Sequence, residues 1–468
     1  TKAMNTDDTI AAIATPIGVG GIGIIKISGP HATAVADSIF VARKPRARGP
    51  LPAHRLLLGS IRDPATHEII DEVLLAFMPG PASYTREDVL EIHCHSGLVV
   101  LERILELVLH HSGVRLAEPG EFTRRAFMNG RLDLTQVEAV LDIITARTAT
   151  ALKKAAGQLG GSLHERITRF KQDLTAVLVH IESAIDFPEE DLELFPAAQI
   201  VERLSTVKKK MRKLLATYEE GRLLREGVRA VILGCPNVGK SSILNALVEE
   251  DRAIVCTIPG TTRDTIEESV SVRGIPVMLV DTAGLPPQSP ADPVEAQGAE
   301  RTRRQAARAD VVLFVLDGSR PFSPDDMTVA QEFQKQRMIV VINKADLPQL
   351  LDTSSLPELL RDLPAVRVSA KYHKYIEILR DVLYERISRH NEETGGASVI
   401  INRLRHKNSL EKACRALERA LVSMEQGISM EFIAVDIHEA LAHLGELVGE
   451  TTSEEILDHI FAEFCIGK

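Results

Sequence analysis

The chain has 468 residues, which is enough for about three domains of ordinary size. Its hydrophobic content of 44% and charged content of 26% are ordinary for a soluble globular protein. No apolar run approaches the ~20 residues needed to span a bilayer, and no signal peptide is visible. The net charge of −10 gives no global sign of nucleic-acid binding.

Five cysteines are scattered along the sequence without C-x-x-C spacing, at Cys94, Cys235, Cys256, Cys414 and Cys465. An odd set without paired spacing argues against a disulfide framework or a zinc site and is typical of a reducing cytosol. We therefore expect the protein to be cytoplasmic.

Residues 1–120 have the pattern of a mixed α/β domain. Short apolar runs predict strands at residues 10–15, 23–27, 73–77 and 89–93, and helical spacing predicts a helix over residues 98–111. Within this region Gly18, Gly20 and Gly23 match G-x-G-x-x-G. A dinucleotide site requires a helix directly after the glycines, whereas residues 24–27 read as a strand, so no Rossmann site is predicted.

His93 and His95 are a second candidate for a ligand site in this domain. Strand alternation places both imidazoles on one face, but no third metal ligand is apparent. Ordinary polar packing is therefore the favoured interpretation.

From about residue 121 to 224 the pattern becomes helical. An apolar stripe predicts one long packed helix, with Leu163, Ile167, Phe170, Leu174, Val177, Leu178, Ile181 and Ile185 at steps of three and four. Residues 187–191 interrupt the stripe, and a second helix is predicted from about residue 197 to 224. The basic run at residues 208–213 could contact phosphates, but a solvated helix face is favoured because alternating charge is common on helices.

A phosphate-binding motif lies near the start of the next region, residues 225–390. Residues 234–241 match G-x-x-x-x-G-K-[ST] between a strand-like run and a predicted helix start. The glycines allow a tight turn whose N–H groups face phosphate oxygens at a helix N-terminus. Lys240 would reach the β- and γ-phosphates, and the Ser241 hydroxyl would ligate Mg²⁺. The nucleotide contacts predicted for this loop come from Asn237, Val238, Gly239, Lys240, Ser241 and Ser242.

Two segments downstream complete the predicted phosphate and Mg²⁺ site. The loop Gly260-Thr261-Thr262-Arg263-Asp264 is in the place of a switch that supplies a threonine, Thr262, to Mg²⁺. Asp281-Thr282-Ala283-Gly284 follows a strand-like run, which puts a carboxylate near Mg²⁺ and a glycine N–H near the γ-phosphate.

Two further segments identify the base as guanine. Asn343-Lys344-Ala345-Asp346 follows a buried-strand run, and the Asp346 carboxylate would accept from both N1–H and the exocyclic amine of guanine. Ser369-Ala370-Lys371 is in the place of the loop that backs the base. All five segments occur in the correct order, so we predict a P-loop, Ras-like GTPase domain.

Helical periodicity resumes in the last region, residues 391–468, over residues 401–421 and 437–447. The GTPase domain is therefore predicted to be inserted into a helical domain, as the close termini of compact domains permit. The final helix should be packed almost to its end, because apolar residues recur with helical spacing at Ile456, Leu457, Ile460, Phe461 and Phe464.

Several short segments outside the GTPase domain form a specific combination. They are residues 14–16 with the glycine run and Ser28-Gly29, residues 83–91, 119–123 and 125–134, and the terminal Cys465-Ile466-Gly467-Lys468. With an inserted GTPase carrying G-T-T-R-D, the chain resembles the MnmE (TrmE) family of tRNA-modification GTPases over its whole length.

The resemblance implies a multidomain fold of α/β and all-α parts. These are an N-terminal α/β domain that dimerises and binds folate, a helical domain, and the inserted GTPase domain. It also implies a homodimer that joins an FAD-dependent MnmG-type protein in a heterotetramer. Together they would add a (carboxymethyl)aminomethyl-type group to C5 of the wobble uridine, position 34, of certain tRNAs. The one-carbon unit would come from 5-formyltetrahydrofolate or a related derivative.

By the same resemblance, the folate site would use Lys26, Glu91, Arg131 and Lys468. A carboxylate pairs with the 2-amino-pyrimidinone edge of a pterin, and cations steady its oxygens and glutamate tail. Lys26 stands where arginine is usual and Arg131 where lysine is usual, which bears on affinity because the two cations differ in geometry. Cys465 would be either a reactive thiol near the one-carbon unit or a packed neighbour of the terminal lysine, and the catalytic interpretation is slightly favoured.

GTP hydrolysis needs a device other than the water-orienting glutamine of Ras-like proteins, because Leu285 stands at that position and Arg263 is a weak candidate for an arginine finger. The resemblance implies a K⁺ ion where two GTPase domains meet. Its ligands would be Asn237 of the phosphate loop together with Cys256, Ile258 and Thr261. These last three belong to a predicted nucleotide-binding stretch that consists of Cys256, Thr257, Ile258, Pro259, Gly260 and Thr261. Glu295 matches the glutamate that orients the attacking water in the family, and an apparent two-residue insertion within residues 285–291 precedes it in the alignment. The alternative interpretation of Glu295 is structural, because a carboxylate is favourable at a helix N-terminus.

Two other classes of function remain open from the sequence. A ribosome-assembly GTPase switch would need an RNA-binding module beside the GTPase domain, and none is evident. A stand-alone folate enzyme would need a catalytic constellation independent of a partner. Co-purification with a flavoprotein would favour the tRNA-modification reading over both.

Overall fold

The computed structural model describes residues 8–44, 50–187, 195–250, 267–281, 300, 303–304, 306–333, 337–388 and 399–468. The chain divides into two compact units: one consists of Thr1–Leu141 with Gly445–Lys468, and the other of Asp142–Leu444. No helix in the described ranges combines the length and apolar character needed to cross a membrane.

The first unit is built on a seven-stranded sheet with the order β3-β4-β5-β6-β2-β1-β7. Its strands are β1 (Thr9–Ile13), β2 (Gly23–Ser28), β3 (Phe40–Ala42), β4 (Leu56–Arg62), β5 (Ile69–Met78), β6 (Val89–Cys94) and β7 (Val114–Leu116). Only the β1–β7 pair is parallel. The strand predicted after the glycine run is confirmed as β2, while β3, β4 and β7 were not predicted.

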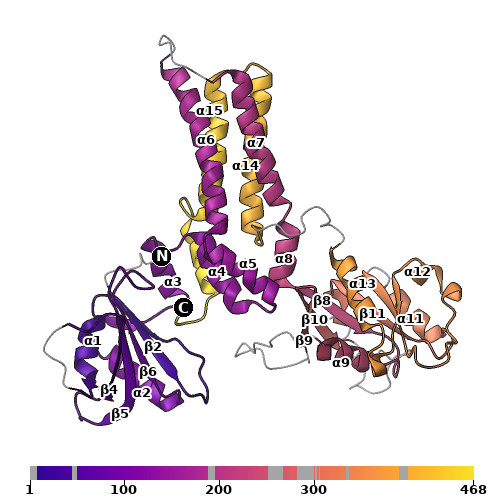
Figure 1. Ribbon diagram of the computed structural model, residues 1–468, viewed down its shortest axis with the longest axis horizontal. Coiled ribbons are helices and arrows are strands. Elements are labelled where there is room, and N and C mark those ends of the chain that lie inside the picture. The colour runs from indigo at the N-terminus through magenta and orange to yellow at the C-terminus, as the bar shows by residue number, and fades with distance from the viewer. Residues whose placement is uncertain are drawn as a thin grey trace. The chain divides into compact units, whose positions relative to one another are not determined.

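The helices α1 (Ala32–Ile39) and α2 (Leu98–Leu109) cover one face of this sheet (Figure 1). Ile25, Ile27 and Ile92 are fully buried in the core that these helices share with the sheet. Because side chains alternate along a strand, Lys26, between Ile25 and Ile27, and Glu91, beside Ile92, point to the opposite face. That open face carries the first candidate site.

The C-terminal segment of the chain packs onto this same unit. Helix α16 (Glu454–Ala462) lies against α3 (Glu121–Met128), where the rings of Phe461 and Phe127 have their centroids 6.5 Å apart. Phe464 is buried beyond the end of α16. Gly467 has φ +94°, and a Cβ there would lie 2.6 Å from the carbonyl oxygen of Ile13, so the backbone approach requires glycine. The predicted packing of the final helix is confirmed, apart from Ile456, which is exposed.

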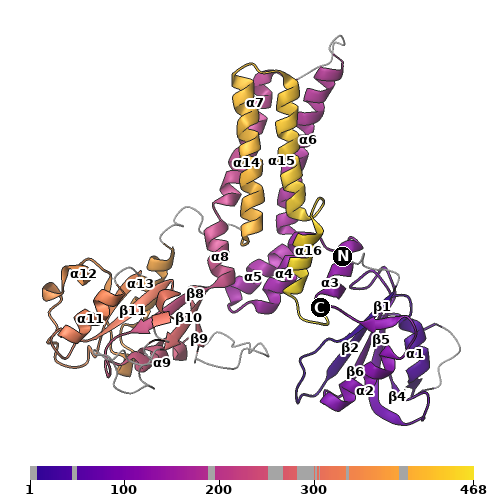
Figure 2. The same ribbon diagram turned by 180° about the vertical axis from the view of Figure 1, so that it is seen from behind.

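The second unit contains a bundle of long helices. They are α6 (Ser162–Asp186), α7 (Ala197–Leu215), α14 (Leu404–Glu425) and α15 (Met430–Val448), with the shorter α5 (Ala149–Leu159) and α8 (Tyr218–Glu226) in the same unit. Helix α4 (Leu134–Thr145) belongs to the first unit up to Leu141. Figure 2 shows the four long helices side by side, and α7 packs against both α6 and α14. The apolar stripe predicted for α6 is confirmed, because Leu163 through Ile181 on this stripe are buried.

The prediction of one continuous helix over residues 197–224 was wrong. The helix ends at Leu215 and a new one, α8, begins at Tyr218. Between them the Thr217 hydroxyl donates to the Leu214 carbonyl at 2.6 Å and accepts from the Ile401 backbone N–H at 3.1 Å. A side-chain hydrogen bond to a nearby carbonyl competes with helix continuation. The second partner of the Thr217 hydroxyl, Ile401, is 184 residues away in the sequence.

The basic run on α7 has the surroundings of a solvated helix face. Lys208 and Arg212 both pair with Glu418, at 3.7 Å and 3.1 Å, and Lys210 pairs with Asp173 at 3.5 Å. These are exposed or half-exposed pairs, which contribute little to stability.

A six-stranded sheet with the order β13-β12-β11-β8-β10-β9 is inserted between α8 and α14. Its strands are β8 (Val228–Leu233), β9 (Glu267–Val272), β10 (Ile275–Asp281), β11 (Val311–Asp317), β12 (Met338–Asn343) and β13 (Ala365–Arg367). All neighbours are parallel except β9 and β10, and the four central strands are continuous apolar runs, as buried parallel strands require. The fold therefore combines an N-terminal α/β domain with a helical domain that an α/β P-loop domain interrupts.

The two connections of this insertion lie together. Gly221 in α8 faces the returning segment so closely that a Cβ there would lie 2.2 Å from the carbonyl oxygen of Ile401. Asn402 and Arg403 of that segment are both anchored on the Asp142 carboxylate at 2.7 Å. The bounds predicted for the four segments, residues 1–120, 121–224, 225–390 and 391–468, remain predictions.

Candidate functional site

The loop of residues 234–241 has the shape of a phosphate cradle at the start of α9 (Lys240–Glu250). Gly234 has φ +151° and Gly239 has φ +96°, while Asn237 is left-handed with φ +63°. A Cβ at Gly234 would lie 2.4 Å from the Val315 carbonyl oxygen, and one at Gly239 would lie 2.2 Å from the Asn343 side chain. Both glycines are therefore required by close approach, and the helix N-terminus behind them suits an anion.

Lys240 folds back over this loop. Its side chain is buried, and its ammonium donates to the carbonyl oxygens of Gly234 at 3.1 Å and Cys235 at 2.9 Å. The ammonium therefore already lies at the loop that would surround the phosphates. Ser241 and Ser242 are exposed at the start of α9, and the Cys235 thiol is buried, which raises its pKa to about 12. Cys235 is accordingly a packing residue of the loop.

Asn343 joins the phosphate loop to the loop predicted to back the base. Its side-chain amide donates to the Val238 carbonyl at 2.9 Å, and its side-chain oxygen accepts from the Ala370 N–H at 3.1 Å. Asn343 is buried, so both bonds form away from water. The structure thus brings together three segments that the sequence predicted to act on one nucleotide.

Asp346 and Lys344 lie at the same edge of the sheet. The buried Ser369 hydroxyl donates to the Asp346 carboxylate at 2.5 Å, and this hydrogen bond lowers the pKa of Asp346. Lys344 has φ +64°, and its ammonium contacts the Asp317 carboxylate at 2.6 Å. Asp346 is exposed and ionised at neutral pH, as an acceptor for two guanine donors must be.

Much of the predicted switch and ion site lies outside the described residues. This applies to Cys256, Thr257, Ile258, Pro259, Gly260, Thr261, Thr262, Thr282, Ala283, Gly284 and Glu295, and of Asp281 only the backbone at the end of β10 is described. Lys371 is exposed next to Ala370.

The second cluster lies on the open face of the seven-stranded sheet. Lys26 on β2 is the direct cross-strand partner of Glu91 on β6. The Lys26 ammonium lies 4.5 Å from the centroid of the Tyr84 ring and 5.0 Å from that of Phe122. Burial lowers the pKa of Lys26 to about 8; Glu91 opposes this shift, while Lys468 and Arg131 reinforce it.

Arg131 and the chain terminus complete this cluster. The Arg131 guanidinium lies 4.6 Å from the centroid of the Tyr84 ring and donates to the Tyr84 carbonyl at 3.0 Å. Docking of the C-terminal segment brings Lys468 close enough to interact electrostatically with Lys26. The four residues singled out from the sequence, Lys26, Glu91, Arg131 and Lys468, therefore come together.

Sequence reasoning did not assign three neighbours to this cluster, although His93 was named as a candidate metal ligand. Tyr84 and Phe122 form aromatic contacts with Lys26, and His93 contacts Glu91 at 3.2 Å. Tyr84 and Phe122 lie in segments that carried the family resemblance, so their position in those segments was the available signal. His95 instead bonds to Asp71 at 2.8 Å, and no group of three or more metal-ligating side chains occurs in the described part of the chain.

Cys465 lies at the rim of the docked terminus. It is exposed as a free thiol, while its backbone carbonyl accepts from the Gly120 N–H at 3.5 Å and the Lys468 N–H at 3.3 Å. Its backbone is thus tied to the domain that carries Lys26.

Comparison with known proteins gives the family. The family model described as MnmE helical domain matches residues 134–465, and the one described as GTP-binding protein TrmE N-terminus matches residues 9–131. The proteins named tRNA modification GTPase MnmE from Geotalea uraniireducens and Carboxydothermus hydrogenoformans are 44% and 45% identical to the chain. Both alignments cover 99% of this chain and 100% of the relative.

Two solved GTPase structures show partial likeness. The G domain of the T. maritima FeoB iron transporter is 24% identical, with 34% of this chain and 98% of that chain covered and a TM-score of 0.28. Era in complex with MgGDPNP and a segment of 16S ribosomal RNA is 24% identical, with 40% and 66% covered and a TM-score of 0.27. On the full-length relatives and the two domain matches, the chain belongs to the MnmE family of tRNA modification GTPases.

Proposed function

We propose that this GTPase modifies C5 of the wobble uridine, position 34, of certain tRNAs. It would act in the cytoplasm with an FAD-dependent MnmG-type partner and a tetrahydrofolate one-carbon donor. The single observation that carries the proposal is the presence of two built sites, the Lys240–Asn343 nucleotide site and the Lys26–Glu91 cluster, in a chain related over its whole length to tRNA modification GTPases.

The nucleotide site fits GTP. The loop of residues 234–241 would bind the phosphates, and Lys240 supplies a buried cation beside them. The tight course of this loop requires glycine at positions 234 and 239, where any side chain would clash with Val315 or Asn343. Asp346 would pair with the two donors of guanine, held in direction by Ser369. Ser241 at the start of α9 and Thr262 would hold Mg²⁺, which neutralises charge between the phosphates.

Hydrolysis would depend on a second GTPase domain. A K⁺ ion held by Asn237, Cys256, Ile258 and Thr261 would supply positive charge to the phosphates, and Glu295 would orient the water. Asn237 is exposed on the left-handed turn of the phosphate loop, which supports a role toward a ligand or partner.

The Lys26 cluster fits a reduced folate. Lys26 interacts electrostatically with the carboxylate of Glu91 and with two further cations, Arg131 and Lys468, and two aromatic rings border Lys26. A pterin offers Glu91 a pair of N–H donors, and its glutamate tail offers carboxylates to the cations. The exposed Cys465 thiol would act beside the one-carbon unit, since it belongs to the tetrapeptide that ends in Lys468.

A homodimer would cover the rest of the open sheet face. Across this face the strand register runs from Leu56 through Ala76 and Glu91 to Lys26. The outer part of the face is apolar, with Leu56 57% exposed, Leu58 40% and Leu74 38%. An apolar patch beside a charged cluster is typical of a buried interface, and we propose a second copy of the chain as its partner.

Nucleoside mass spectrometry of tRNA tests the proposal. Cells that lack the gene should lose the wobble modification, the wild-type gene should restore it, and Lys240→Ala should not. Normal wobble uridines in the deleted strain, together with a ribosomal-subunit assembly defect, would instead support the alternative of a ribosome-assembly switch.

A further inference from the structure

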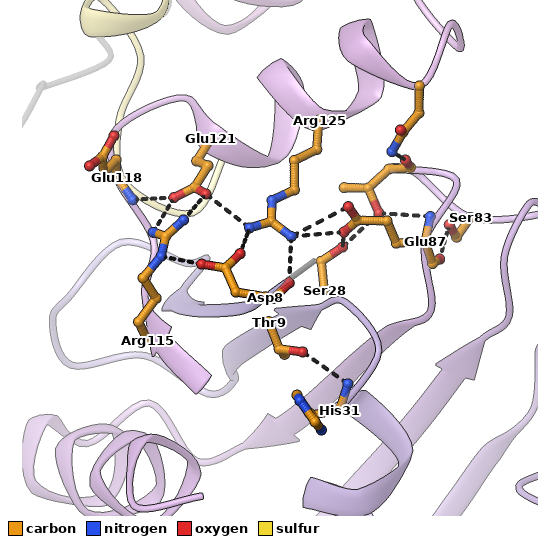
Figure 3. Close-up of polar contacts among 12 residues, drawn as sticks. Asp8, Thr9, Ser28, His31, Ser83, Glu87, Arg115, Glu118, Glu121 and Arg125 are labelled. Carbon is orange, nitrogen blue, oxygen red and sulfur yellow. Dashed lines mark hydrogen bonds and ion pairs between the residues drawn. The ribbon is translucent and has the colours of Figure 1, made fainter. Parts of the chain in front are cut away.

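A network of charges centred on the buried side chains of Arg125 and Glu121 lies in the same domain as the Lys26 cluster and has no role in the function proposed so far. It consists of five side chains: Asp8, Glu87, Arg115, Glu121 and Arg125 (Figure 3). Arg125 and Glu121 come from α3, Arg115 from β7, and Glu87 from the loop before β6. The network therefore ties the loop of residues 83–87 to the body of the domain.

We propose that Arg125, acting through Glu87, is a positioning residue that holds the loop of residues 83–87 so that Tyr84 borders Lys26 and Arg131. The proposal deepens the folate site and rests on it. Neither Arg125 nor Glu87 would touch the ligand.

Arg125 is suited to this role by its burial and its planar fork of donors. Its side chain is 1% exposed. One terminal nitrogen donates to the Asp8 carbonyl at 2.9 Å and to the Glu87 carboxylate at 3.2 Å, and the other donates to the carboxylates of Asp8 at 2.5 Å and Glu121 at 3.1 Å. A lysine has no such fork, so it would hold fewer of these acceptors at once.

The charges of the network persist at neutral pH. Burial opposes ionisation of Asp8, but hydrogen bonds from Arg115 and Arg125 outweigh it and lower the pKa of the carboxyl. Burial likewise opposes ionisation of Glu121, and the hydrogen bond from Arg115 leads the effects that lower its pKa. Arg125 therefore faces ionised carboxylates, and a buried ion pair that loses one partner leaves the other charge without compensation.

Glu87 connects Arg125 to the loop of residues 83–87. Its carboxylate also accepts from the Ser28 hydroxyl at 2.7 Å, and the Ser28 hydroxyl contacts the hydroxyl of Thr85 at 2.6 Å. The Glu87 backbone carbonyl accepts from the Ser83 hydroxyl at 2.5 Å. The start of the loop at Ser83 is thus bonded to its end at Glu87, and Ser28 lies on the same strand as Lys26.

Tyr84 sits between these anchors and forms the wall of the site. Its ring contacts the cations of Lys26 and Arg131, and its hydroxyl bonds to Thr123 at 3.0 Å. Thr123 lies on α3, two residues before Arg125. Arg131 and Asn129 also bond to the carbonyls of Tyr84 and Thr85, at 3.0 Å and 2.7 Å. A loop released from Arg125 would therefore lose one of the anchors of the backbone that carries the ring and would become looser there.

The test compares two charge-removing variants of similar shape. Glu87→Gln removes the charge from the link between Arg125 and the loop and replaces one of its two acceptor oxygens by an NH₂ donor. Glu121→Gln is the matched control, because Glu121 is buried in the same network but bonds to Arg115, Arg125 and the Glu118 N–H rather than to the loop. Full-length protein is titrated with 5-formyltetrahydrofolate in calorimetry, and its melting temperature and GTP affinity are measured in parallel.

We expect Glu87→Gln to weaken folate binding about tenfold, the size typical of a lost charge-assisted hydrogen bond, with GTP affinity unchanged. Glu121→Gln should lower the melting temperature without this loss of affinity. In a Tyr84→Ala background, Glu87→Gln should have no further effect on folate binding, because the positioned ring is gone. Equal losses of affinity in Glu87→Gln and Glu121→Gln, or an undiminished loss in the Tyr84→Ala background, would overturn the proposal.

Hydrogen exchange of the ligand-free protein separates this proposal from the folate assignment. Peptides covering residues 83–88 should exchange faster in Glu87→Gln and stay as in wild type in Glu121→Gln. Unchanged exchange in Glu87→Gln would refute the positioning role whatever the ligand. Wild-type protein that fails to bind 5-formyltetrahydrofolate would instead refute the folate site. The hydrogen-exchange rates of residues 83–88 would then still test whether Glu87 positions the loop.

Discussion

The side-chain amide of Asn343 donates a hydrogen bond of 2.9 Å to the backbone carbonyl of Val238, although the two residues are 105 positions apart. The same side chain accepts from the Ala370 N–H, so one buried residue holds the phosphate loop and the base loop at a set separation. A nucleotide that spans both loops would find them already in place, which lowers the entropy lost on binding.

Asn343→Ala should therefore weaken GTP binding by tenfold or more and lower the melting temperature. The Val238 carbonyl and the Ala370 N–H would lose their buried partner, and each unsatisfied group costs about 1–3 kcal/mol. Calorimetry with a non-hydrolysable GTP analogue and thermal unfolding would measure both effects, with the exposed Glu358→Gln as control. Wild-type affinity in Asn343→Ala would contradict this role.

Guanine selectivity should depend on Asp346. Asp346→Asn should weaken GTP binding and favour xanthine nucleotides, because an amide offers a donor where guanine needs an acceptor. Ser369→Ala should weaken GTP binding less, since it removes only the hydrogen bond that orients the carboxylate. Competition binding with GTP, XTP and ATP would measure the preference, and an unchanged order of affinities in Asp346→Asn would refute the assignment.

GTP turnover should be faster in KCl than in NaCl and should rise with protein concentration. Both dependences follow if a K⁺ ion between two GTPase domains supplies the charge that an arginine finger supplies elsewhere. Asn237→Ala should reduce the difference between the two salts. Equal rates in KCl and NaCl across protein concentrations would argue against an ion in this role.

Folate affinity should fall as the pH rises through about 8, because Lys26 loses its charge there. The pKa of Lys26 is lowered from 10.5 by burial, so the unfolded chain binds more protons than the folded one between these values. In that window the contribution of Lys26 to the free energy of unfolding rises with pH. Lys26→Arg stays charged and should flatten the decline in folate affinity, measured by titrations across this pH range; an identical decline in both proteins would exclude Lys26 as its source.

Deletion of the last four residues should abolish folate binding and tRNA modification and leave GTP affinity nearly intact. Gly467 packs against Ile13, and Lys468 reaches the surroundings of Lys26, so the terminus lines that cluster in the first unit. Calorimetry with 5-formyltetrahydrofolate and with GTP would measure the two binding affinities. Full folate affinity in the truncated protein would show that the tail does not line the site.

Features that depend on neighbours along the chain could be predicted from the residues alone. The phosphate loop, Asn343-Lys344-Ala345-Asp346 and Ser369-Ala370-Lys371 each follow a strand directly, so local spacing placed them at the ends of β8, β12 and β13. The stripe of α6 and the strand after Gly23 were equally legible, because periodicity reports which face of an element is buried.

Features that depend on partners far away in the sequence could be recognised only from the folded chain. The break before α8 follows from Thr217 bonding to Ile401, and Arg125 could not be recognised as the centre of a network until Asp8, Glu87 and Glu121 surrounded it. Lys26, Glu91, Arg131 and Lys468 were named together through family resemblance, whereas their meeting depends on strand register and on docking of the chain terminus. Register and docking are set by non-local burial, which leaves little trace in the spacing of residues along the chain.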